Sequence, residues 1–577
     1  MEMTPDFSYA LSVGTERVAA WADLLDSINV FPVADGDTGR NLVISLAPLN
    51  KSDRRSAELI DLLLMSARGN SGNIASLFFC GFLQSDFVGT FPEAIQQGRE
   101  SAWNAVPNPK QGTMLSLFEA LDEAVAANYK PDDWHWIEPV LERLELAVHD
   151  TFEQLPELQQ AGVVDAGALG MFIFFDGFLN MLNGGQSNFR PIAEVFKERL
   201  SISDTWQAQA MEGSCIDAVL HVSEDAEQNV EDLNELGNSI VAMRHGDYYK
   251  IHMHSKDSIH VKEKLSGMGD MLRWSSDDLK DQTEKFPGTK SKAAIHIMTD
   301  AAGSFSRSEA IELDVTLLDS YISVGEICMP ETYVQPLDMY GEMTKGTKVS
   351  TSQASVFERH QHYEKVLSLY DKVLYLCVGS VFTGNFQVVS DWKKEHDPDN
   401  KMTVIDTGAA SGRLGLMSYV TAQFARQAQS AQEVIDFARA AVESCEEYIF
   451  LDKLQYLAAG GRLSKTGAFF GDMLHVKPVV TPLADGVKKV ATVRNQADQI
   501  KLALEMLNRS LDPASPGVIM LEFSDNEEWV KTEVYDKIAQ RYPDTRIVFH
   551  PISLTSGAHM GPGTWAVAFV QLSQKLQ

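Results

Sequence analysis

Residues 29–41 read NVFPVADGDTGRN and set two carboxylates, Asp35 and Asp37, on either side of Gly36. Aspartate, glycine and asparagine favour tight turns, so a surface turn would account for the composition. A turn alone gives no use for two like charges held close together. A divalent cation does, because Mg²⁺ binds through one or two carboxylates and leaves its other positions to water and substrate phosphates. The segment therefore predicts a magnesium site near the start of the chain.

Glycine-bearing connections of this kind recur between predicted helices in residues 1–200. Apolar residues fall at helical spacing in segments such as TMLSLFEALDEAVAA (113–127). The connections ARGNSGN (67–73), PKQGTM (109–114) and GVVDAGALG (162–170) each stand just before such a segment. Free N–H groups at a helix N-terminus bind phosphate readily. Helix starts of this type, repeated in one helical domain, predict a nucleotide site.

Composition bounds the class of protein. A chain of 577 residues is too long for one hydrophobic core, so about three or four domains are expected. The net charge of −31 argues against nucleic-acid binding, which depends on Lys and Arg, and against binding to an anionic membrane surface. The five cysteines have no paired spacing, which indicates a reducing compartment. With no signal peptide and no run of about 18–20 apolar residues, a cytoplasmic protein is expected.

The pattern changes twice along the chain. Residues 205–290 contain predicted strands such as SCIDAVLHV (214–222), which indicates a small α+β domain. The segment FPGTKSKA (286–293) has the composition of a linker. In residues 294–577, apolar strands run into loops of small or hydroxyl residues and then into helices, as in parallel α/β units. Ligands of such sheets bind beyond the carboxyl ends of the strands, where these loops gather.

Two histidines in the middle region have a spacing that suits a metal. In YYKIHMHSKD, the period of two places Lys250, His252 and His254 on one face of a strand. The Cα atoms of histidines at i and i+2 lie ~6–7 Å apart, close enough to share one ion. Cys215 could be a third ligand of Zn²⁺, with water in the fourth position. By itself a His-x-His pair is a poor indicator of a metal site, because such pairs are usually solvated strand residues.

The four N-terminal motifs, in their order, resemble the ATP-binding DhaL-type domain of dihydroxyacetone kinases, and more closely the kinase subunit of bacterial fatty acid kinase. The resemblance implies an all-α helical barrel over residues 1–200 that holds ATP on magnesium ions. Asp35 and Asp37 match the metal-binding aspartates, and Asn29 lies near the place of a third ligand. The positions that match the nucleotide-binding motifs are Asn41, Ser71, Gly72, Gly112, Thr113, Asp165 and Gly167. Arg40 and Ala168 depart from the family, which usually has a small residue and a glycine there.

Residues 205–290 resemble the middle domain of the same kinase subunit. That resemblance implies that Cys215, His252 and His254 bind zinc. It adds to the strand spacing, which leaves the choice between a metal site and a solvated face open.

Residues 294–577 resemble the DegV family of fatty-acid-binding proteins through VSTSQAS, VGSVFTGNF, GGRLSK followed by KPVV, and HMGPG. This implies a two-lobed α/β fold with the fatty acid tail in a tunnel and its carboxylate at the mouth. Matched by position, the residues that hold the carboxylate are Thr351, Ser352, Ser380, Arg462 and His559. Arginine suits this role because it stays charged and grips carboxylates with two hydrogen bonds. The opening strand TDAAGSF and Gly379 depart from the family pattern.

Taken together, the resemblances imply a single-chain fatty acid kinase that transfers the γ-phosphate of ATP to the carboxylate of a bound fatty acid. Asp35 and Asp37 would hold Mg²⁺ on the triphosphate, while Arg462 and His559 aim the carboxylate; no strong general base is needed. By analogy a homodimer is expected, and a downstream acyltransferase would use the acyl phosphate. Two alternatives stay open: a non-catalytic, nucleotide-gated fatty-acid carrier or sensor, and a dihydroxyacetone-type kinase acting on a small polyol.

Overall fold

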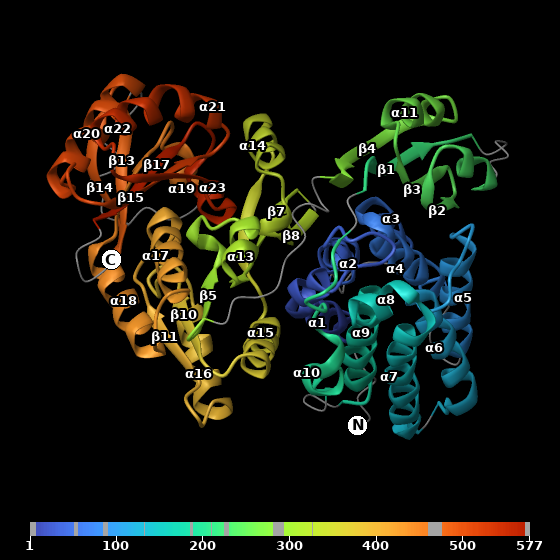
Figure 1. Ribbon diagram of the computed structural model, residues 1–577. Coiled ribbons are helices and arrows are strands. Elements are labelled where there is room, and N and C mark those ends of the chain that lie inside the picture. Colours follow the sequence, from blue (N-terminus) through green and yellow to red (C-terminus); the bar gives the residue numbers. More distant parts are fainter. Residues whose placement is uncertain are drawn as a thin grey trace. The chain divides into compact units, whose positions relative to one another are not determined.

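The computed structural model describes residues 7–50, 56–84, 91–131, 133–184, 189–208, 211–223, 230–280, 293–325, 327–459 and 476–571. The chain forms two compact units, Met1–Thr289 and Lys290–Gln577, which are described separately (Figure 1). Among the described residues, no helix has the length and apolar character needed to cross a membrane.

The first unit begins with a helical domain, as the apolar spacing predicts. Its helices are α1 (Phe7–Ser27), α2 (Thr38–Leu46), α3 (Ser56–Ser66), α4 (Gly69–Phe82), α5 (Phe91–Asn104), α6 (Met114–Asn128), α7 (Ile137–Gln154), α8 (Pro156–Ala161), α9 (Ala166–Leu182) and α10 (Ile192–Val195), with 3₁₀ turns at Ala47–Asn50, Trp134–Trp136 and Lys197–Arg199. Helices α1 and α9 pack closely because glycines face each other across them. A Cβ atom on Gly14 would lie 2.9 Å from the Phe174 ring, and one on Gly177 would lie 3.2 Å from the Cα of Gly14.

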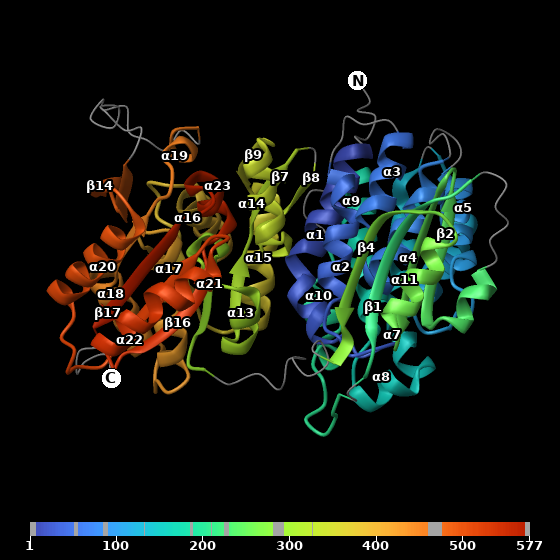
Figure 2. The same ribbon diagram turned by 90° about the horizontal axis from the view of Figure 1, so that it is seen from above.

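A small antiparallel sheet follows in the same unit. It contains β1 (Ser214–His221), β2 (Asn238–His245), β3 (Tyr248–Ser255) and β4 (Asp270–Asp278) in the order β2-β3-β1-β4, with α11 (Ser258–Ser266) and a 3₁₀ turn at Val230–Glu235. Strands β1, β2 and β3 contact α4, and Figures 1 and 2 show the sheet lying over the part of the helical domain that contains α4. The N–H of Ala242 donates to the carbonyl of Ala105 at 3.0 Å. The α+β domain is therefore docked on the helices.

The second unit has the α/β architecture predicted for it. Its strands are β5 (His296–Asp300), β6 (Val315–Leu318), β7 (Ser320–Val324), β8 (Ile327–Pro330), β9 (Val349–Gln353), β10 (Val373–Cys377), β11 (Met402–Asp406), β12 (Glu446–Phe450), β13 (Lys477–Leu483), β14 (Gly486–Val493), β15 (Gly517–Phe523), β16 (Arg546–Pro551) and β17 (Trp565–Gln571). Its α-helices are α13 (Arg307–Leu313), α14 (Pro336–Lys345), α15 (Val356–Leu369), α16 (Asn385–His396), α17 (Ser411–Ala425), α18 (Ala431–Ser444), α19 (Gln455–Ala459), α20 (Gln496–Ser510), α21 (Glu527–Trp529), α22 (Asp536–Arg541) and α23 (Leu554–Met560). Short 3₁₀ turns lie at Ala301–Gly303 and Glu331–Tyr333, and Val530–Tyr535 forms a π-helical turn.

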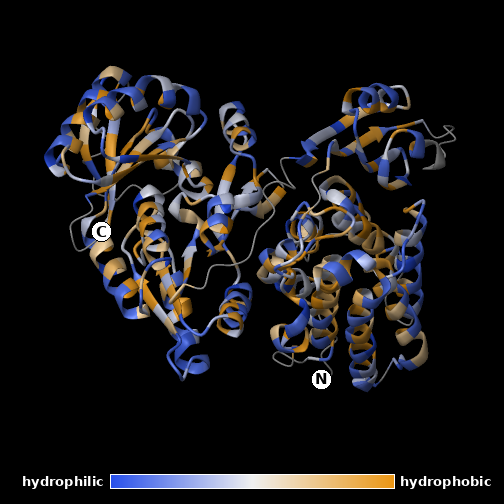
Figure 3. Cartoon of the chain, viewed as in Figure 1, coloured by the Kyte–Doolittle hydropathy of each residue, from blue (hydrophilic) through white to orange (hydrophobic). Residues whose placement is uncertain are grey.

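These strands make three sheets. One is parallel, in the order β11-β10-β5-β6; one has six strands, in the order β14-β13-β12-β17-β15-β16; and one has three, in the order β8-β7-β9. Strands β15 and β17 of the six-stranded sheet carry buried apolar residues on both faces, so helices cover the sheet on both sides. Val518 and Met520 face the core shared with α17 and α18, whereas Ile519 and Leu521 face the core beneath α20. Figure 3 shows hydrophobic residues along β15 and β17 and hydrophilic ones on α20 and α22.

A buried carboxylate holds the carboxyl ends of two parallel strands together. Asp300, the last residue of β5, accepts hydrogen bonds from Arg359 (2.7 Å), the Tyr375 hydroxyl (2.8 Å) and the Val378 N–H (2.9 Å). Asn385, the first residue of α16, donates to the same carboxylate at 2.8 Å. The loop that carries Ser380 is therefore anchored at both of its ends.

Candidate functional site

The acidic turn lies directly before α2. Gly36, between Asp35 and Asp37, has a φ of 64°, a conformation that glycine adopts without strain. The Nδ2 of Asn29 donates to Asp35 Oδ1 at 2.6 Å. All three predicted metal ligands therefore belong to one local cluster.

The charges of this cluster call for a cation. Burial and the neighbouring Asp37 carboxylate raise the pKa of Asp35 well above its usual range. Arg40 reaches Asp37 Oδ2 only at 3.8 Å and is half-exposed. A divalent cation between the two carboxylates would remove their repulsion, so the donor set fits Mg²⁺.

The N-terminus of α2 is capped by a residue that the sequence analysis did not identify. Asp26, near the end of α1, accepts from the N–H groups of Gly39 (2.6 Å) and Arg40 (3.1 Å). The N-cap residue itself, Asp37, makes no capping hydrogen bond through its side chain. Its carboxylate lies instead beside Asp35 and 3.8 Å from Arg40 Nη2. No local sequence pattern identifies Asp26 as a cap, because it belongs to α1 and caps α2.

The predicted nucleotide residues converge from several helix N-termini. The hydroxyls of Thr38 on α2 and Ser71 on α4 lie 3.1 Å apart. At Gly167 in the first turn of α9, a Cβ atom would lie 3.5 Å from Ser71 Oγ and 3.0 Å from the Cε of Met114, the first residue of α6. The N-termini of α2, α4, α6 and α9 thus meet, and the positive ends of their helix dipoles suit a polyphosphate.

Asp165 is built into the start of α9. Its Oδ1 accepts from the Ala168 N–H at 2.7 Å, so it is the N-cap of α9. Burial raises the pKa of Asp165 to about 7, opposed by hydrogen bonds from the backbone of Ala168, Met114 and Gly167. The alanine at position 168 keeps the backbone donor that the family's glycine would supply.

The remaining predicted residues support the same helix starts. Thr113 caps α6 by accepting from the Leu115 N–H at 3.3 Å, and the Gly112 N–H donates to Ser116 Oγ at 2.9 Å. Asn41 lies on α2 against α4: a Cβ atom on Gly69 would lie 2.0 Å from its Nδ2.

Gly72 sets the separation of α2 and α4, and we expect Gly72→Ala to damage the site. A Cβ atom there would lie 2.1 Å from Ser45 Oγ and 2.9 Å from the Asn41 carbonyl oxygen. The two helices would have to move apart, which should destabilise the first unit by roughly 1–3 kcal/mol and weaken ATP binding. Thermal unfolding and ATP titration measure both effects. Gly341→Ala on α14, where the added methyl meets open space, is the control, and equal behaviour of the two variants would contradict the prediction.

A second cluster lies in the small sheet. Because β1 and β3 pair antiparallel, Cys215 stands opposite His254 and Asp217 stands opposite His252. One ligand atom each from Cys215, His252 and His254 lie within 4.8 Å of one another, and all three side chains are buried. The period-of-two prediction is confirmed, and the face it defines is turned inward, which excludes the solvated alternative.

The imidazole of His254 is in the form that binds a metal. Burial and the neighbouring His252 lower the pKa of His254 to about 3, so its imidazole is neutral. The Nε2 of His252 and the Nδ1 of His254 are buried without a hydrogen-bond partner, and the Nδ1 of His252 lies 3.4 Å from Asp217 Oδ1. Burial and nearby carboxylates, Asp217 first, raise the pKa of Cys215, so a cation is needed to hold its thiolate. The set fits Zn²⁺ with three protein ligands.

The two clusters are neighbours. Val33, two residues before Asp35, packs against Cys215 in a small apolar cluster with Leu279. Asp37 and Asp35 both contribute to the raised pKa of the Cys215 thiol. The acidic turn therefore packs against the middle domain, close to Cys215.

We expect the purified protein to carry about one zinc ion per chain at this cluster. His254→Ala should remove most of the metal and lower the thermal stability of the metal-loaded protein, because metal binding stabilises only the folded state. Elemental analysis after dialysis measures the metal content. His260→Ala, an exposed histidine on α11, is the control. Equal metal content in both variants would place the zinc elsewhere.

The predicted fatty-acid residues are partly brought together in the second unit. Thr351 Oγ1 on β9 and His559 Nε2 on α23 lie 3.2 Å apart, whereas Ser352, the next residue of β9, is exposed and lies on the opposite face of the strand. Ser380 donates its hydroxyl to Asp406 Oδ2 at 2.5 Å, so its substrate role stays a prediction. Arg462 lies outside the described residues.

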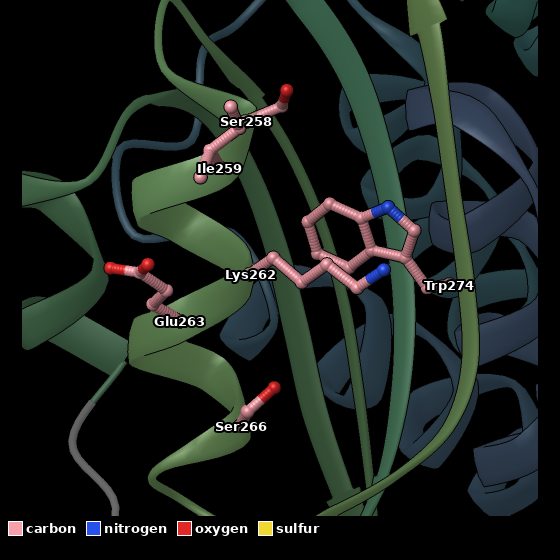
Figure 4. Close-up of a pocket in the computed structure, with 6 residues that line it drawn as sticks. All are labelled: Ser258, Ile259, Lys262, Glu263, Ser266 and Trp274. Carbon is pink, nitrogen blue, oxygen red and sulfur yellow. The ribbon is translucent and has the colours of Figure 1, made fainter.

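Two surface pockets lie away from these sites. One of about 630 Å³ lies between α11 and β4, lined by Ser258, Ile259, Lys262, Glu263, Ser266 and Trp274 (Figure 4). The other, of about 240 Å³, includes Glu309, Tyr419 and Arg546. Neither is lined by a residue that the sequence predicts for nucleotide, metal or fatty acid.

Comparison with protein families identifies three successive domains. Residues 32–180 match the DAK2 domain, residues 212–286 match the middle domain of proteins like the A component of fatty acid kinase, and residues 294–572 match the DegV family of uncharacterised proteins. The chain is thus a fusion of a DhaL-type (DAK2) domain and a fatty acid kinase-like middle domain with a DegV-family domain.

Individual relatives cover only parts of this chain. Protein YloV of Bacillus subtilis is 27% identical over 321 residues, which cover 50% of this chain and 57% of that protein. The chain thus spans about half the length of the first curated relatives it matches. A DegV domain-containing protein of Clostridium perfringens is 26% identical over 281 residues, 48% of this chain and 96% of that protein.

Solved structures match the same share of the chain as the DegV relative. A structure described as fatty acid binding of a DegV family protein from Thermus thermophilus is 21% identical, with a TM-score of 0.45, and covers 48% of this chain and 100% of that one. DegV of Bacillus subtilis, described as a fatty acid binding protein, is 19% identical, with a TM-score of 0.44 and the same coverage.

Proposed function

We propose that this chain is a fatty acid kinase that transfers the γ-phosphate of ATP to the carboxylate of a fatty acid held by its own DegV-family domain. The observation that carries the proposal is the meeting of four helix N-termini beside the Asp35–Asp37 pair. The kinase-like middle domain on the same unit and the DegV-family domain further along the chain define the acceptor class.

The nucleotide would lie where the helices converge. The N-termini of α2, α4, α6 and α9 would face the phosphate oxygens with the positive ends of their dipoles, with Ser71 and Thr38 as hydroxyl donors. Asp35 and Asp37 would hold magnesium, which neutralises charge on the triphosphate during transfer. The half-exposed Arg40 can swing to the phosphates once a cation takes over Asp37.

The acceptor is a carboxylate, which is already a nucleophile. One of its oxygens attacks the γ-phosphorus, the bond to the β–γ bridging oxygen breaks, and ADP leaves with that oxygen. The protein therefore has to bind and aim the acid rather than remove a proton. Thr351 and His559, which lie 3.2 Å apart, would hold the carboxylate, together with Arg462 as the resemblance implies.

Carrying both domains on one chain raises the concentration of the acid at the nucleotide. A short linker gives an effective concentration on the order of millimolar, well above that of a free fatty acid. Separate kinase and carrier proteins would have to meet by diffusion.

Trapping the product tests the proposal. Purified protein, Mg-ATP and oleic acid are mixed with hydroxylamine, which converts an acyl phosphate to a hydroxamate that mass spectrometry detects. We expect oleoyl hydroxamate and ADP in equal amounts. ATP binding and lipid binding without hydroxamate would favour the carrier or sensor. ADP production that requires a small polyol and no lipid would favour the polyol kinase.

A further inference from the structure

Helix α4, which carries Ser71, begins without a cap of its own. Its N-cap residue, Arg68, has the extended backbone that caps usually have (φ −141°, ψ 150°), but its side chain makes no capping hydrogen bond. Arginine has no acceptor atom and cannot bond the free N–H groups of a first turn. The next residue, Gly69, has a φ of +59°, and a Cβ atom there would lie 2.0 Å from Asn41 Nδ2. The start of α4 is thus closely packed and lacks a local cap.

The missing acceptor comes from the middle domain. Asp217 Oδ2 on β1 accepts from the Gly69 N–H at 3.1 Å, from a position 148 residues away in the sequence. Its other oxygen, Oδ1, accepts from Asn73 Nδ2 at 3.0 Å. Asn73 also donates to the Gly69 carbonyl oxygen at 2.7 Å, which ties the first turn together. One carboxylate therefore caps α4 from another domain.

A buried lysine completes the arrangement. Lys250 Nζ on β3 lies 3.2 Å from Asp217 Oδ1 and donates to the Ala67 carbonyl oxygen at 2.8 Å. The side chains of Lys250 and Asp217 are 4% and 9% exposed, so this ion pair is shielded from water. Together the two residues grip the α3–α4 connection on both sides of Arg68.

We propose that Asp217 is a positioning residue of the nucleotide site, which fixes the first turn of α4 so that Ser71 stays beside Thr38 and Gly167. This inference rests on the proposed function, because it assumes that ATP binds where these helices converge. Ser71 is the third residue of α4, in the same turn as the Gly69 N–H that Asp217 binds. Loss of the cap frays this turn first, since the first turn of a helix has no other internal hydrogen-bond acceptor for its N–H groups.

The same carboxylate borders the predicted zinc ligands. His252 Nδ1 lies 3.4 Å from Asp217 Oδ1, and Cys215 is two residues before Asp217 on the same face of β1. Asp217 thus contacts both the Cys215–His252–His254 cluster and the first turn of α4.

The test is Asp217→Asn in the full chain, measured by calorimetric titration of Mg-ATP. Asparagine keeps the shape but presents an N–H₂ group to donors where an acceptor is needed. Since hydrogen bonds to a charged group are strong, ATP affinity should fall roughly 10- to 100-fold. In turnover, the KM for ATP should rise by the same factor while kcat changes by less than about threefold. Asp247→Asn, an exposed aspartate in the turn between β2 and β3, is the matched control and should bind like the parent.

A rescue variant separates positioning from a general loss of structure. Arg68→Asp places a capping carboxylate at the N-cap position itself, where the backbone is already suited to it. In the Asp217→Asn background it should restore most of the ATP affinity. Hydrogen exchange at residues 69–71 should quicken in Asp217→Asn, return toward the parent rate in the double variant, and leave α9 unchanged throughout.

Each outcome decides. Unchanged ATP affinity in Asp217→Asn, with affinity lost in Asp35→Asn, would overturn the role of Asp217 and leave the proposed function standing. A loss that the rescue variant does not restore, or faster exchange throughout the first unit, would mark Asp217 as only structural. A parent protein that does not bind Mg-ATP would refute the proposed function, and this inference with it.

Discussion

Replacing both Asp35 and Asp37 with asparagine is expected to reduce phosphoryl transfer by roughly 10³-fold or more. Asparagine at position 35 still accepts the hydrogen bond from Asn29, so the turn should keep its shape. Without the two negative charges, no divalent cation is held at the triphosphate. Because the two carboxylates repel each other in the parent, thermal stability without magnesium should not fall. Hydroxamate formation and thermal unfolding measure the two effects.

The second unit serves as an internal check on this variant. Fatty-acid binding should be unchanged, since the substituted residues belong to the first unit. Asp150→Asn with Asp204→Asn removes the same charge from other positions of the first unit and should retain activity. Activity within tenfold of the parent in the Asp35–Asp37 variant would refute the assignment of these residues to the metal.

Local chemistry made part of the site predictable. The Asp35–Gly36–Asp37 turn places two carboxylates within three adjacent residues, which is enough to predict a metal site. The period of two in β3 was enough to place His252 and His254 on one face. The fold class followed in the same way from helical spacing before residue 200 and from strand–loop–helix units after residue 294. These patterns depend only on residues that are close together in the sequence.

Contacts between distant elements were not predictable in this way. Asp26 and Asp217 each cap a helix to which they do not belong, and no pattern near Gly39 or Gly69 indicates where the acceptor comes from. One sign of Asp217 was present: it alternates with Cys215 in SCIDAVLHV and so had to share the face of the metal ligands. What required the structure was the packing of that face on α4.

A pair of buried acids in the second unit was also invisible from sequence. Glu447 on β12 and Glu522 on β15 are both fully buried. Glu447 accepts from the N–H groups of Gly412 (3.2 Å) and Arg413 (2.9 Å) at the start of α17. A Cβ atom on Gly412 would lie 1.9 Å from Glu522 Oε2, so this glycine makes room for the second acid.

The pair should make the second unit less stable as pH rises. Burial raises the pKa of Glu447 to about 7 from 4.5, and burial together with Glu447 raises the pKa of Glu522 well above its usual range. The folded state therefore holds protons that the unfolded chain releases above pH 4.5, and stability falls as pH rises from there through about 7. The sign is opposite to that of a salt-bridged carboxylate.

Glu522→Gln isolates this effect. At pH 5 both groups are neutral in the folded state and the variant should match the parent, whereas at pH 8 it should be more stable than the parent, because unfolding no longer releases the proton that the folded state holds on Glu522. Hydrogen exchange of β15 and β17 at pH 5 and pH 8, extrapolated to a common intrinsic rate, reports the free energy of opening of this unit. Glu331 in the same unit also has a pKa raised by burial to about 7, so part of the slope should remain in the variant. Glu505→Gln on the exposed side of α20 should leave the slope intact. Equal destabilisation of Glu522→Gln at both pH values would mean that the glutamate acts through its hydrogen bonds, and that the pair does not hold the extra proton.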